Sequence, residues 1–172
     1  MKKILLVLFL ISINIHVFAQ EESTTKYFFM RHAEKDRSDK TNKNPELTEI
    51  GLNRANFWRD VLSNVPFDMV YSTNYKRTIQ TAQPTADKNN LEIIFYDPRD
   101  MFNEEFQKNT KGKNVLVVGH SNTTWVFANK VIDEEKYSEI EDNNNSNLYI
   151  VTLKGDKIKD VLFKIEPSTK IN

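Results

Sequence analysis

The sequence contains no cysteine among its 172 residues, and only 4 glycines and 5 prolines. Without a thiol the chain can form no disulfide, no thiolate metal site and no covalent intermediate or lipid anchor on cysteine. It also has no net charge, because 24 Lys and Arg balance 24 Asp and Glu. General binding to nucleic acid or to an anionic membrane needs a basic excess, so this balance argues against both functions.

The first 19 residues have the pattern of an export signal. Two lysines precede an apolar run over 4–13, and Ala19 offers a small residue for cleavage. Polar residues end the run well short of the roughly 20 residues that span a membrane, which favours cleavage over retention as an anchor. We therefore expect a signal peptide over 1–19 and one domain over 20–172. This domain is expected to be exported to the periplasm or the extracellular space, without stable membrane insertion.

Predicted strands and helices alternate as far as residue 132. The apolar runs that predict strands are 27–30, 67–71, 91–96 and 115–118. Two alternating segments, 148–153 and 158–165, flank a Lys-Gly-Asp-Lys turn and predict an antiparallel hairpin. This order predicts an α/β fold with three αβα layers, in which a mostly parallel sheet ends in an antiparallel C-terminal edge. The segment 139–147 is predicted to be a polar surface loop without a role in the chemistry.

The predicted helices begin after residues that can cap them. Thr48 is expected to cap the first helix, and the segment 72–74 the second. Pro84 is expected to kink or restart the second helix. A third helix is predicted over 101–108 and a fourth beyond the turn at 119–122.

Several polar residues follow directly on the predicted strands. In open α/β sheets, ligands bind beyond the carboxyl ends of the strands, so these residues are expected to meet at one edge of the sheet. The candidate functional residues there are Arg31, His32, Arg77, Asp97, His120 and Ser121.

This set of side chains suits a phosphoryl group. Two guanidinium groups and helix N-termini bind a doubly charged oxyanion. A neutral imidazole can attack phosphorus and form a phosphohistidine, while a second, protonated histidine stabilises the oxygens in transfer. Because protein groups supply the cations, this chemistry needs no metal and no cofactor.

Each of these signals also has a purely structural interpretation. A single histidine at a strand end is more often a hydrogen-bonded structural group. Zinc binding is disfavoured because the two distant histidines, His32 and His120, form no HxH or HExxH pattern. A cation in the first turn of a helix is usually solvated, yet Arg77 there opposes the helix dipole, which favours an anionic partner.

Four segments resemble the sequence blocks of the histidine phosphatase (phosphoglycerate mutase-like) superfamily. They are 30–35 (MRHAEK), 47–51 (LTEIG), 71–82 (YSTNYKRTIQTA) and 118–122 (VGHSN). They follow the family's order and cover most of the chain that remains after the leader. The resemblance implies a phosphoglycerate mutase-like fold and an Arg-His-Gly-type signature at Arg31, His32 and Ala33.

The resemblance also implies a role for each matching residue. His32 would be the phosphorylated nucleophile, and Arg31 and Arg77 would bind the phosphoryl oxygens. His120 would complete the pocket electrostatically, and the backbone at Ser121 would face the anion.

The chain departs from the family pattern in two ways. Ala33 stands where the family usually has glycine, as is common in the short, phosphohistidine-phosphatase-like branch. The acidic proton donor of larger members has no clear match. Asp97 is the nearest candidate by position, and Glu34 and Glu104 are alternatives.

These observations predict an exported, metal-independent phosphatase that hydrolyses a phosphate monoester or related phosphoryl compound through phosphorylated His32. The substrate would be a phosphorylated small molecule or a phosphoprotein, because the chain has no room for the insertions that cap the site in larger relatives. A mutase is disfavoured, since it must retain its phosphoryl group in a closed site. The alternatives are a non-catalytic protein that binds a phosphate ligand in the same pocket, and a structural domain whose charged strand ends are accidental.

Overall fold

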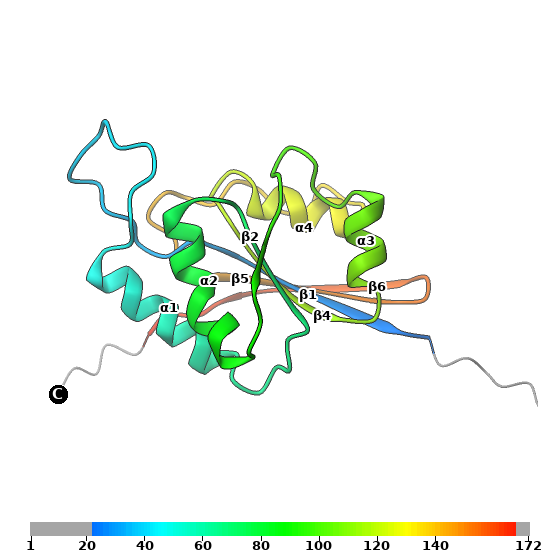
Figure 1. Ribbon diagram of the computed structural model, residues 1–172. Coiled ribbons are helices and arrows are strands. Elements are labelled where there is room, and N and C mark those ends of the chain that lie inside the picture. The colour runs from blue at the N-terminus through cyan, green and yellow to red at the C-terminus, as the bar shows by residue number, and fades with distance from the viewer. Residues whose placement is uncertain (1–21, 168–172) are drawn as a thin grey trace, which may run out of the picture.

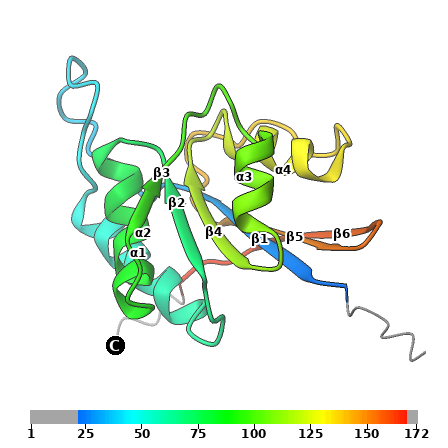
Figure 2. The same ribbon diagram turned by 45° about the vertical axis from the view of Figure 1, so that its right-hand side comes forward.

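The computed structural model describes residues 22–167, so the signal predicted over 1–19 lies outside the described residues. The strands are β1 (Thr24–Arg31), β2 (Met69–Ser72), β3 (Ile93–Phe95), β4 (Asn114–Gly119), β5 (Asn147–Lys154) and β6 (Lys157–Lys164). The helices are α1 (Glu49–Val61), α2 (Lys76–Lys88), α3 (Glu104–Thr110) and α4 (Thr124–Ile132). Helices α1 and α2 lie on one face of the sheet, and α3 and α4 on the other (Figures 1 and 2).

The six strands form one mixed sheet in the order β3-β2-β4-β1-β5-β6. Strands β1 to β4 pair in parallel, while β5 and β6 add an antiparallel edge. The predicted three-layer α/β fold with an antiparallel C-terminal edge is thereby confirmed. The register pairs Arg31 with Gly119 and Ser72 with Val118, so β1, β2 and β4 end at the same level.

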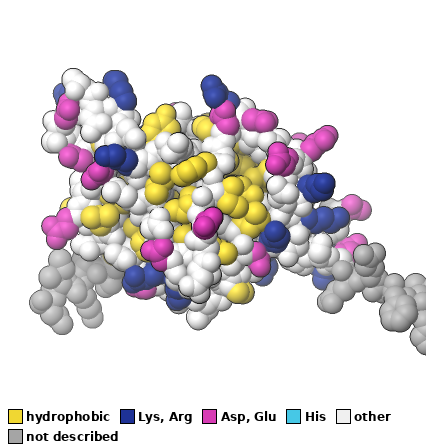
Figure 3. All heavy atoms as spheres, viewed as in Figure 1, with side chains coloured by type: hydrophobic (Ala, Val, Ile, Leu, Met, Phe, Trp, Pro, Cys, Tyr) yellow, Lys and Arg dark blue, Asp and Glu magenta, His cyan; other side chains and the backbone are white. Residues whose placement is uncertain are grey.

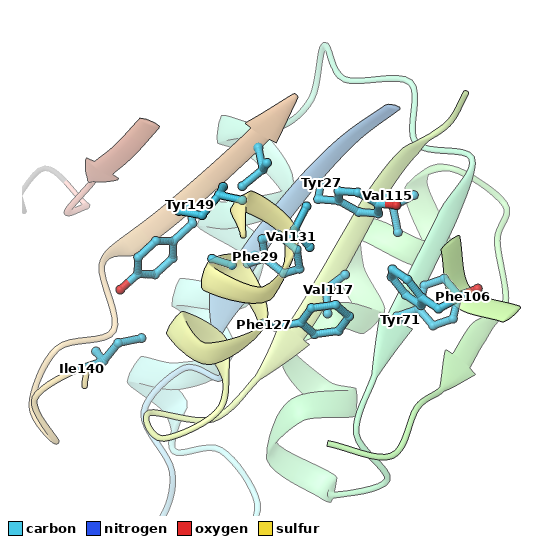
Figure 4. Packing of buried hydrophobic residues seen from close by; sticks show 13 residues of the cluster. Tyr27, Phe29, Tyr71, Phe106, Val115, Val117, Phe127, Val131, Ile140 and Tyr149 are labelled. Atoms are coloured by element: carbon cyan, nitrogen blue, oxygen red, sulfur yellow. The ribbon is translucent and has the colours of Figure 1, made fainter. Parts of the chain in front are cut away.

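Strand β1 lies in the middle of the sheet and is buried on both faces. Tyr27 and Phe29 pack in the cluster under α3 and α4, whereas Phe28 and Met30 pack in the cluster under α1 and α2. Figure 4 shows the first cluster, where Phe29 meets Phe127 of α4 with the ring centroids 5.0 Å apart. This double burial explains why the strand is a continuous apolar run. Because β1 is fixed in the middle of the sheet, the polar residues that follow it lie at the carboxyl end of the sheet, beside the end of β4.

Helix α1 begins as predicted. Thr48 is its N-cap, and the Thr48 hydroxyl accepts a hydrogen bond from the Gly51 N–H at 3.1 Å. A Cβ at position 51 would collide with the Glu34 carbonyl oxygen. Glycine therefore allows the first turn of α1 to pack directly against the segment that follows His32.

Helix α2 differs from the prediction at its start. Its N-cap is Tyr75, which makes no side-chain capping bond, so the segment 72–74 does not cap this helix. The hydroxyl of Thr73 is instead engaged by other side chains of the site. Pro84 lies inside the helix, which runs without interruption from residue 76 to 88, so the chain does not restart there.

The surface seen in Figure 3 has hydrophobic side chains near its centre and charged side chains around them. The edge strand β3 contributes to the exposed apolar surface through Ile94 and Phe95. Within residues 22–167, every helix is too short or too polar to cross a membrane.

Candidate active site

The carboxyl ends of β1, β2 and β4 open into a pocket of about 500 Å³. Its lining residues are Arg31, His32, Lys35, Tyr75, Arg77, Pro98, His120, Ser121, Asn122, Thr123, Glu139 and Asp142. Five of the six residues proposed from the sequence therefore lie in one pocket, and Asp97 does not. A larger hollow of about 800 Å³ lies elsewhere, between the start of β1, α3 and the β5–β6 turn, and contains none of the six.

His32 is held by main-chain groups at the end of β1. Its N–H donates to the Gly119 carbonyl at 2.9 Å, and its side chain is almost fully buried. The ring Nδ1 lies 2.7 Å from the Ala33 carbonyl oxygen. Because a carbonyl can only accept, Nδ1 carries the hydrogen and Nε2 carries the lone pair. Burial above all lowers the pKa of His32 to about 3, with Arg31, His120 and Arg77 acting in the same direction. The imidazole is therefore neutral and nucleophilic at neutral pH.

The residue after His32 ties β1 to α2. The N–H of Ala33 donates to the Thr81 hydroxyl at 2.9 Å, and that hydroxyl donates to the Arg77 carbonyl at 2.7 Å. Ala33 is fully buried and does not adopt a positive φ. Alanine is thus accommodated where the family usually has glycine, and Thr81 sets the position of His32 relative to Arg77.

Arg31 is anchored by the segment before β5. Its Nη1 donates to the carbonyls of Glu141 and Asn144 at 2.8 and 3.1 Å, and its Nη2 pairs with the Asp142 carboxylate at 2.9 Å. None of the described residues offers a hydrogen-bond partner to the buried Nε of Arg31. Burial lowers the pKa of Arg31, and Asp142 opposes this shift.

The prediction that 139–147 is only a polar surface loop is therefore wrong. Besides its contacts with Arg31, this segment holds the main chain at His32, because the Asn145 side-chain amide donates to the His32 carbonyl at 2.7 Å. Residues 145–147 are buried although all three are polar. A biased run of acidic residues and asparagines has no local periodicity that could have revealed these long-range contacts.

Arg77 lines the pocket and carries unpaired donors. Its Nε and Nη1 are buried, and no hydrogen-bond partner for them exists within residues 22–167. Its Nη2 lies 3.4 Å from His120 Nδ1, and its guanidinium lies over the Tyr75 ring, 4.5 Å from the centroid. Burial lowers the pKa of Arg77, with Arg31 adding to the effect. Buried N–H groups without partners are costly, which indicates that this part of the pocket is built for an acceptor-rich ligand.

His120 faces His32 across the pocket, with the ring centroids 5.5 Å apart. Its Nε2 lies 2.9 Å from the Thr73 hydroxyl, and the Tyr75 ring packs edge-on against it at 5.1 Å. Burial is the main cause that lowers the pKa of His120 to about 4, and the cations Arg77, Lys35 and Arg31 lower it further. Burial first, and the neighbouring cations second, thus disfavour a proton on either ring.

The acids proposed as proton donors are engaged elsewhere. Asp97 forms an ion pair with Arg99 at 2.6 Å, and the Arg99 hydrogen bonds lower the pKa of Asp97 to about 2. The carboxylate of Glu34 pairs with Arg54 at 2.7 Å. Glu104 opens α3 and does not line the pocket. The acids that do line it are Glu139 and Asp142.

Four residues outside the proposed set also build the site: Lys35, Thr73, Tyr75 and Thr81. All four fall inside the blocks that carry the family resemblance, so their proximity to the site could have been expected. Three long-range contacts could not, because Thr73 and Tyr75 meet His120, and Thr81 meets Ala33, only in the folded chain.

A neutral imidazole with a defined lone pair thus shares the pocket with a second imidazole and two guanidinium groups, some of whose N–H donors have no partner within residues 22–167. Such a pocket can bind a tetrahedral oxyanion and place its central atom near His32 Nε2. Within residues 22–167, no three His, Asp or Glu side chains gather as potential metal ligands.

Comparisons with known proteins agree with this geometry. The model of the histidine phosphatase superfamily (branch 1) matches residues 27–98. No curated protein matches the chain in sequence. Among solved structures, a SixA protein from Agrobacterium tumefaciens, assigned as a phosphohistidine phosphatase, matches with 19% identity and a TM-score of 0.61 over 81% of this chain and 97% of its own.

Two further structures share the fold. Phosphoglycerate mutase from Bacillus anthracis matches with 13% identity and a TM-score of 0.61, over 81% of this chain and 92% of its own. A phosphoserine phosphatase from Entamoeba histolytica, solved as a mutant in complex with phosphoserine, matches with 14% identity and a TM-score of 0.58, over 76% of this chain and 95% of its own. The match to the family model includes Arg31, His32 and Arg77, so this part of the chain is similar to the histidine phosphatase superfamily, and the solved structures share the fold.

Proposed function

We propose that this protein is a metal-independent phosphatase that transfers a phosphoryl group to His32 Nε2 and then to water. The observation that supports the proposal is a neutral imidazole with its lone pair on Nε2, in one pocket with guanidinium groups whose buried N–H donors lack partners among residues 22–167. Such a combination would supply both a nucleophile and donors for an oxyanion.

The first step forms the bond between His32 Nε2 and phosphorus. The lone pair of Nε2 attacks while the P–O bond to the leaving group breaks, and the leaving oxygen takes the bonding pair and then a proton. Arg31 and Arg77 neutralise the equatorial oxygens, and the Nδ1–H bond to the Ala33 carbonyl stabilises the positive charge that develops on the ring.

The second step returns the enzyme to its starting state. A water oxygen attacks phosphorus, the P–N bond breaks, and its electron pair returns to Nε2. Inorganic phosphate leaves after the attacking water has lost a proton. Since Asp97 is ionised and lies outside the pocket, we expect leaving groups of low pKa to react fastest.

The substrate class we propose is a phosphate monoester or a related phosphoryl compound, on a small molecule or a protein. The pocket has both acidic and basic residues at its mouth, Glu139 and Asp142 beside Lys35, and so does not select a strongly charged leaving group of one sign. The leader pattern supports action in the periplasm or the extracellular space.

One observation favours a second candidate function, which is phosphate-ligand binding without turnover. Glu139 and Asp142 are the acids in the pocket, and Asp142 is committed to Arg31 and Arg37. If no group protonates the leaving oxygen, the pocket binds phosphate esters but does not cleave them.

Replacing His32 with Ala tests the proposal. We expect turnover of p-nitrophenyl phosphate to fall by about 10⁴-fold or more, and an acid-labile phosphoenzyme to disappear, because the group that forms the covalent bond is gone. The Thr110→Val variant is the control, since Thr110 is buried far from the pocket beside Tyr27. Full turnover in the His32 variant would overturn the mechanism. Vanadate binding by calorimetry, with no turnover of any ester in the unmodified protein, would favour the binding function.

A further inference from the structure

A series of hydrogen bonds links Arg77 to His120, His120 to Thr73 and Thr73 to Thr78. His120 Nε2 lies 2.9 Å from the Thr73 hydroxyl, which lies 3.0 Å from the Thr78 hydroxyl. The Thr78 hydroxyl in turn lies 2.8 Å from the Thr73 carbonyl and 2.9 Å from the Tyr75 carbonyl. Both threonine side chains are buried, so water does not compete for these bonds.

The donor and the acceptor of each hydrogen bond in this series are fixed by the groups at its two ends. Carbonyl oxygens only accept, so the Thr78 hydroxyl hydrogen points to one of them. Thr73 must then donate its own hydrogen to Thr78, and its oxygen is left to accept from His120 Nε2. At the other end, the Arg77 guanidinium only donates, so His120 Nδ1 accepts from Nη2 at 3.4 Å. The neutral ring is therefore the Nε2–H tautomer.

We propose that Thr73 is a positioning residue that holds His120 as the Nε2–H tautomer and so makes Nδ1 the nitrogen that exchanges a proton on the substrate side. The inference about the tautomer rests on geometry alone. Its consequence for turnover rests on the proposed phosphatase function.

This hydrogen-bond geometry allows His120 to be protonated at Nδ1 when an anion binds. In the free pocket it faces Arg77 from α2, Arg31 from β1, Lys35 from the following loop and neutral His32, with Tyr75 beside it. The acids Glu139 and Asp142 face the same pocket from the segment before β5. A phosphoryl dianion that draws the Arg77 donors away frees Nδ1, which can then take a proton from bulk water and donate it in a hydrogen bond to a phosphoryl oxygen. Thr73 keeps the opposite proton in place, so both N–H groups of the imidazolium are satisfied.

The tautomer is measurable in the full-length protein by ¹⁵N NMR of labelled histidine, with the His120→Asn variant used to assign the signals. We expect the His120 shifts of the Nε2–H tautomer near neutral pH. In Thr73→Val, where no acceptor faces Nε2, we expect a mixture of tautomers or the Nδ1–H form. Thr73→Ser should restore the original pattern, and Thr110→Val, a buried Thr with a comparable hydroxyl contact, should leave it unchanged.

The kinetic readout separates a positioning role from a merely structural one. In Thr73→Val we expect kcat for p-nitrophenyl phosphate to fall about 10-fold with little change in KM, since the buried Nε2–H of His120 then has no partner. The alkaline limb of the kcat profile should move to lower pH, because the imidazolium has lost an acceptor. Thr73→Ser should recover both.

Thr78→Val supplies a second test that leaves Thr73 in place. It removes the acceptor of the Thr73 hydroxyl, which can then turn its hydrogen toward His120 Nε2, and should weaken the tautomer preference in the same direction. An Nδ1–H tautomer in the unmodified protein, or unchanged His120 shifts in both variants, would overturn the inference. Unchanged turnover beside the expected NMR shifts would leave the tautomer assignment intact and count against the proposed catalytic function.

Discussion

The ends of β1 and β4 each carry one histidine of the pocket, but the two rings are held in different ways. His32 is oriented by main-chain carbonyls, through Ala33 O on its ring and Gly119 O on its own N–H. His120 is oriented by side chains, through Thr73 on one ring nitrogen and Arg77 on the other. A main-chain partner survives any substitution, whereas a side-chain partner can change. The orientation of His32 is thus set by the main chain, whereas the orientation of His120 depends on side chains that substitutions can change.

The largest effect that would test this contrast is the loss of His120. In His120→Asn we expect kcat to fall by about 10²- to 10³-fold, because one charge-stabilising donor is lost while the nucleophile stays oriented. The phosphoenzyme on His32 should still be trapped in a rapid-quench experiment. If the variant forms no phosphoenzyme at all, the two histidines are not independent and the contrast fails.

A second expected effect concerns stability and pH. In the unfolded chain both histidines titrate near pH 6.5, but in the fold the pKa of His32 falls to about 3 and that of His120 to about 4. Between these values and pH 6.5 the unfolded chain binds more protons, so the free energy of unfolding should decrease as pH falls through this window. Above pH 7 neither group contributes to the slope. Each neutral histidine adds up to about 1.4 kcal/mol per pH unit.

Urea unfolding of the wild type and of the double variant His32→Asn/His120→Asn at pH 4.5, 5.5 and 7 measures this contribution. We expect the double variant to lose less stability on acidification. Single variants sharpen the comparison, since the deeper shift belongs to His32. Parallel curves for the wild type and the double variant would show that the rings titrate normally in the fold.

The smallest effect is expected at Asp142, which is 68% exposed and pairs with Arg31 and Arg37. In Asp142→Asn we expect the inhibition constant for inorganic phosphate to fall about threefold, because a competing carboxylate leaves the pocket. Because the Asp142 carboxylate is mostly exposed, its loss should change stability by less than about 1 kcal/mol. Weaker phosphate inhibition would mean that Asp142 serves mainly to hold Arg31 in place. Lys76→Ala, which removes an exposed pair with Glu46 outside the pocket, is the control.

Much of the fold and four residues of the pocket can be predicted from local sequence. Buried strands are apolar runs, and the rule that ligands bind at the carboxyl ends of strands brings together Arg31, His32, Arg77 and His120 without any coordinates. Thr48 was predictable as a cap because capping depends on neighbouring residues alone.

Hydrogen bonds and ion pairs that form only in the folded chain could not be predicted from local sequence. Thr73 resembles a helix cap in sequence, but its hydroxyl is engaged by a ring 47 residues away. Asp97 ends up in an ion pair with Arg99, two residues away, rather than in the pocket. The segment 139–147 carries no periodicity, and its buried Asn145 is satisfied by a carbonyl 113 residues earlier. In each case hydrogen bonds formed in the folded chain override the local preference.

The contacts that fix Arg31 and His32 have a consequence for the order in which the protein matures. Arg31 is anchored by carbonyls 110 and 113 residues later in the chain, and the His32 carbonyl accepts from Asn145, so these contacts form only after the later segment has folded. Closing loops of this length is slow compared with forming local helices and turns. A chain that still lacks its last strands therefore carries all the segments that resemble the family, yet it has neither the anchors of Arg31 nor the partner of the His32 carbonyl. If the proposed function holds, phosphate binding should appear only when folding is complete.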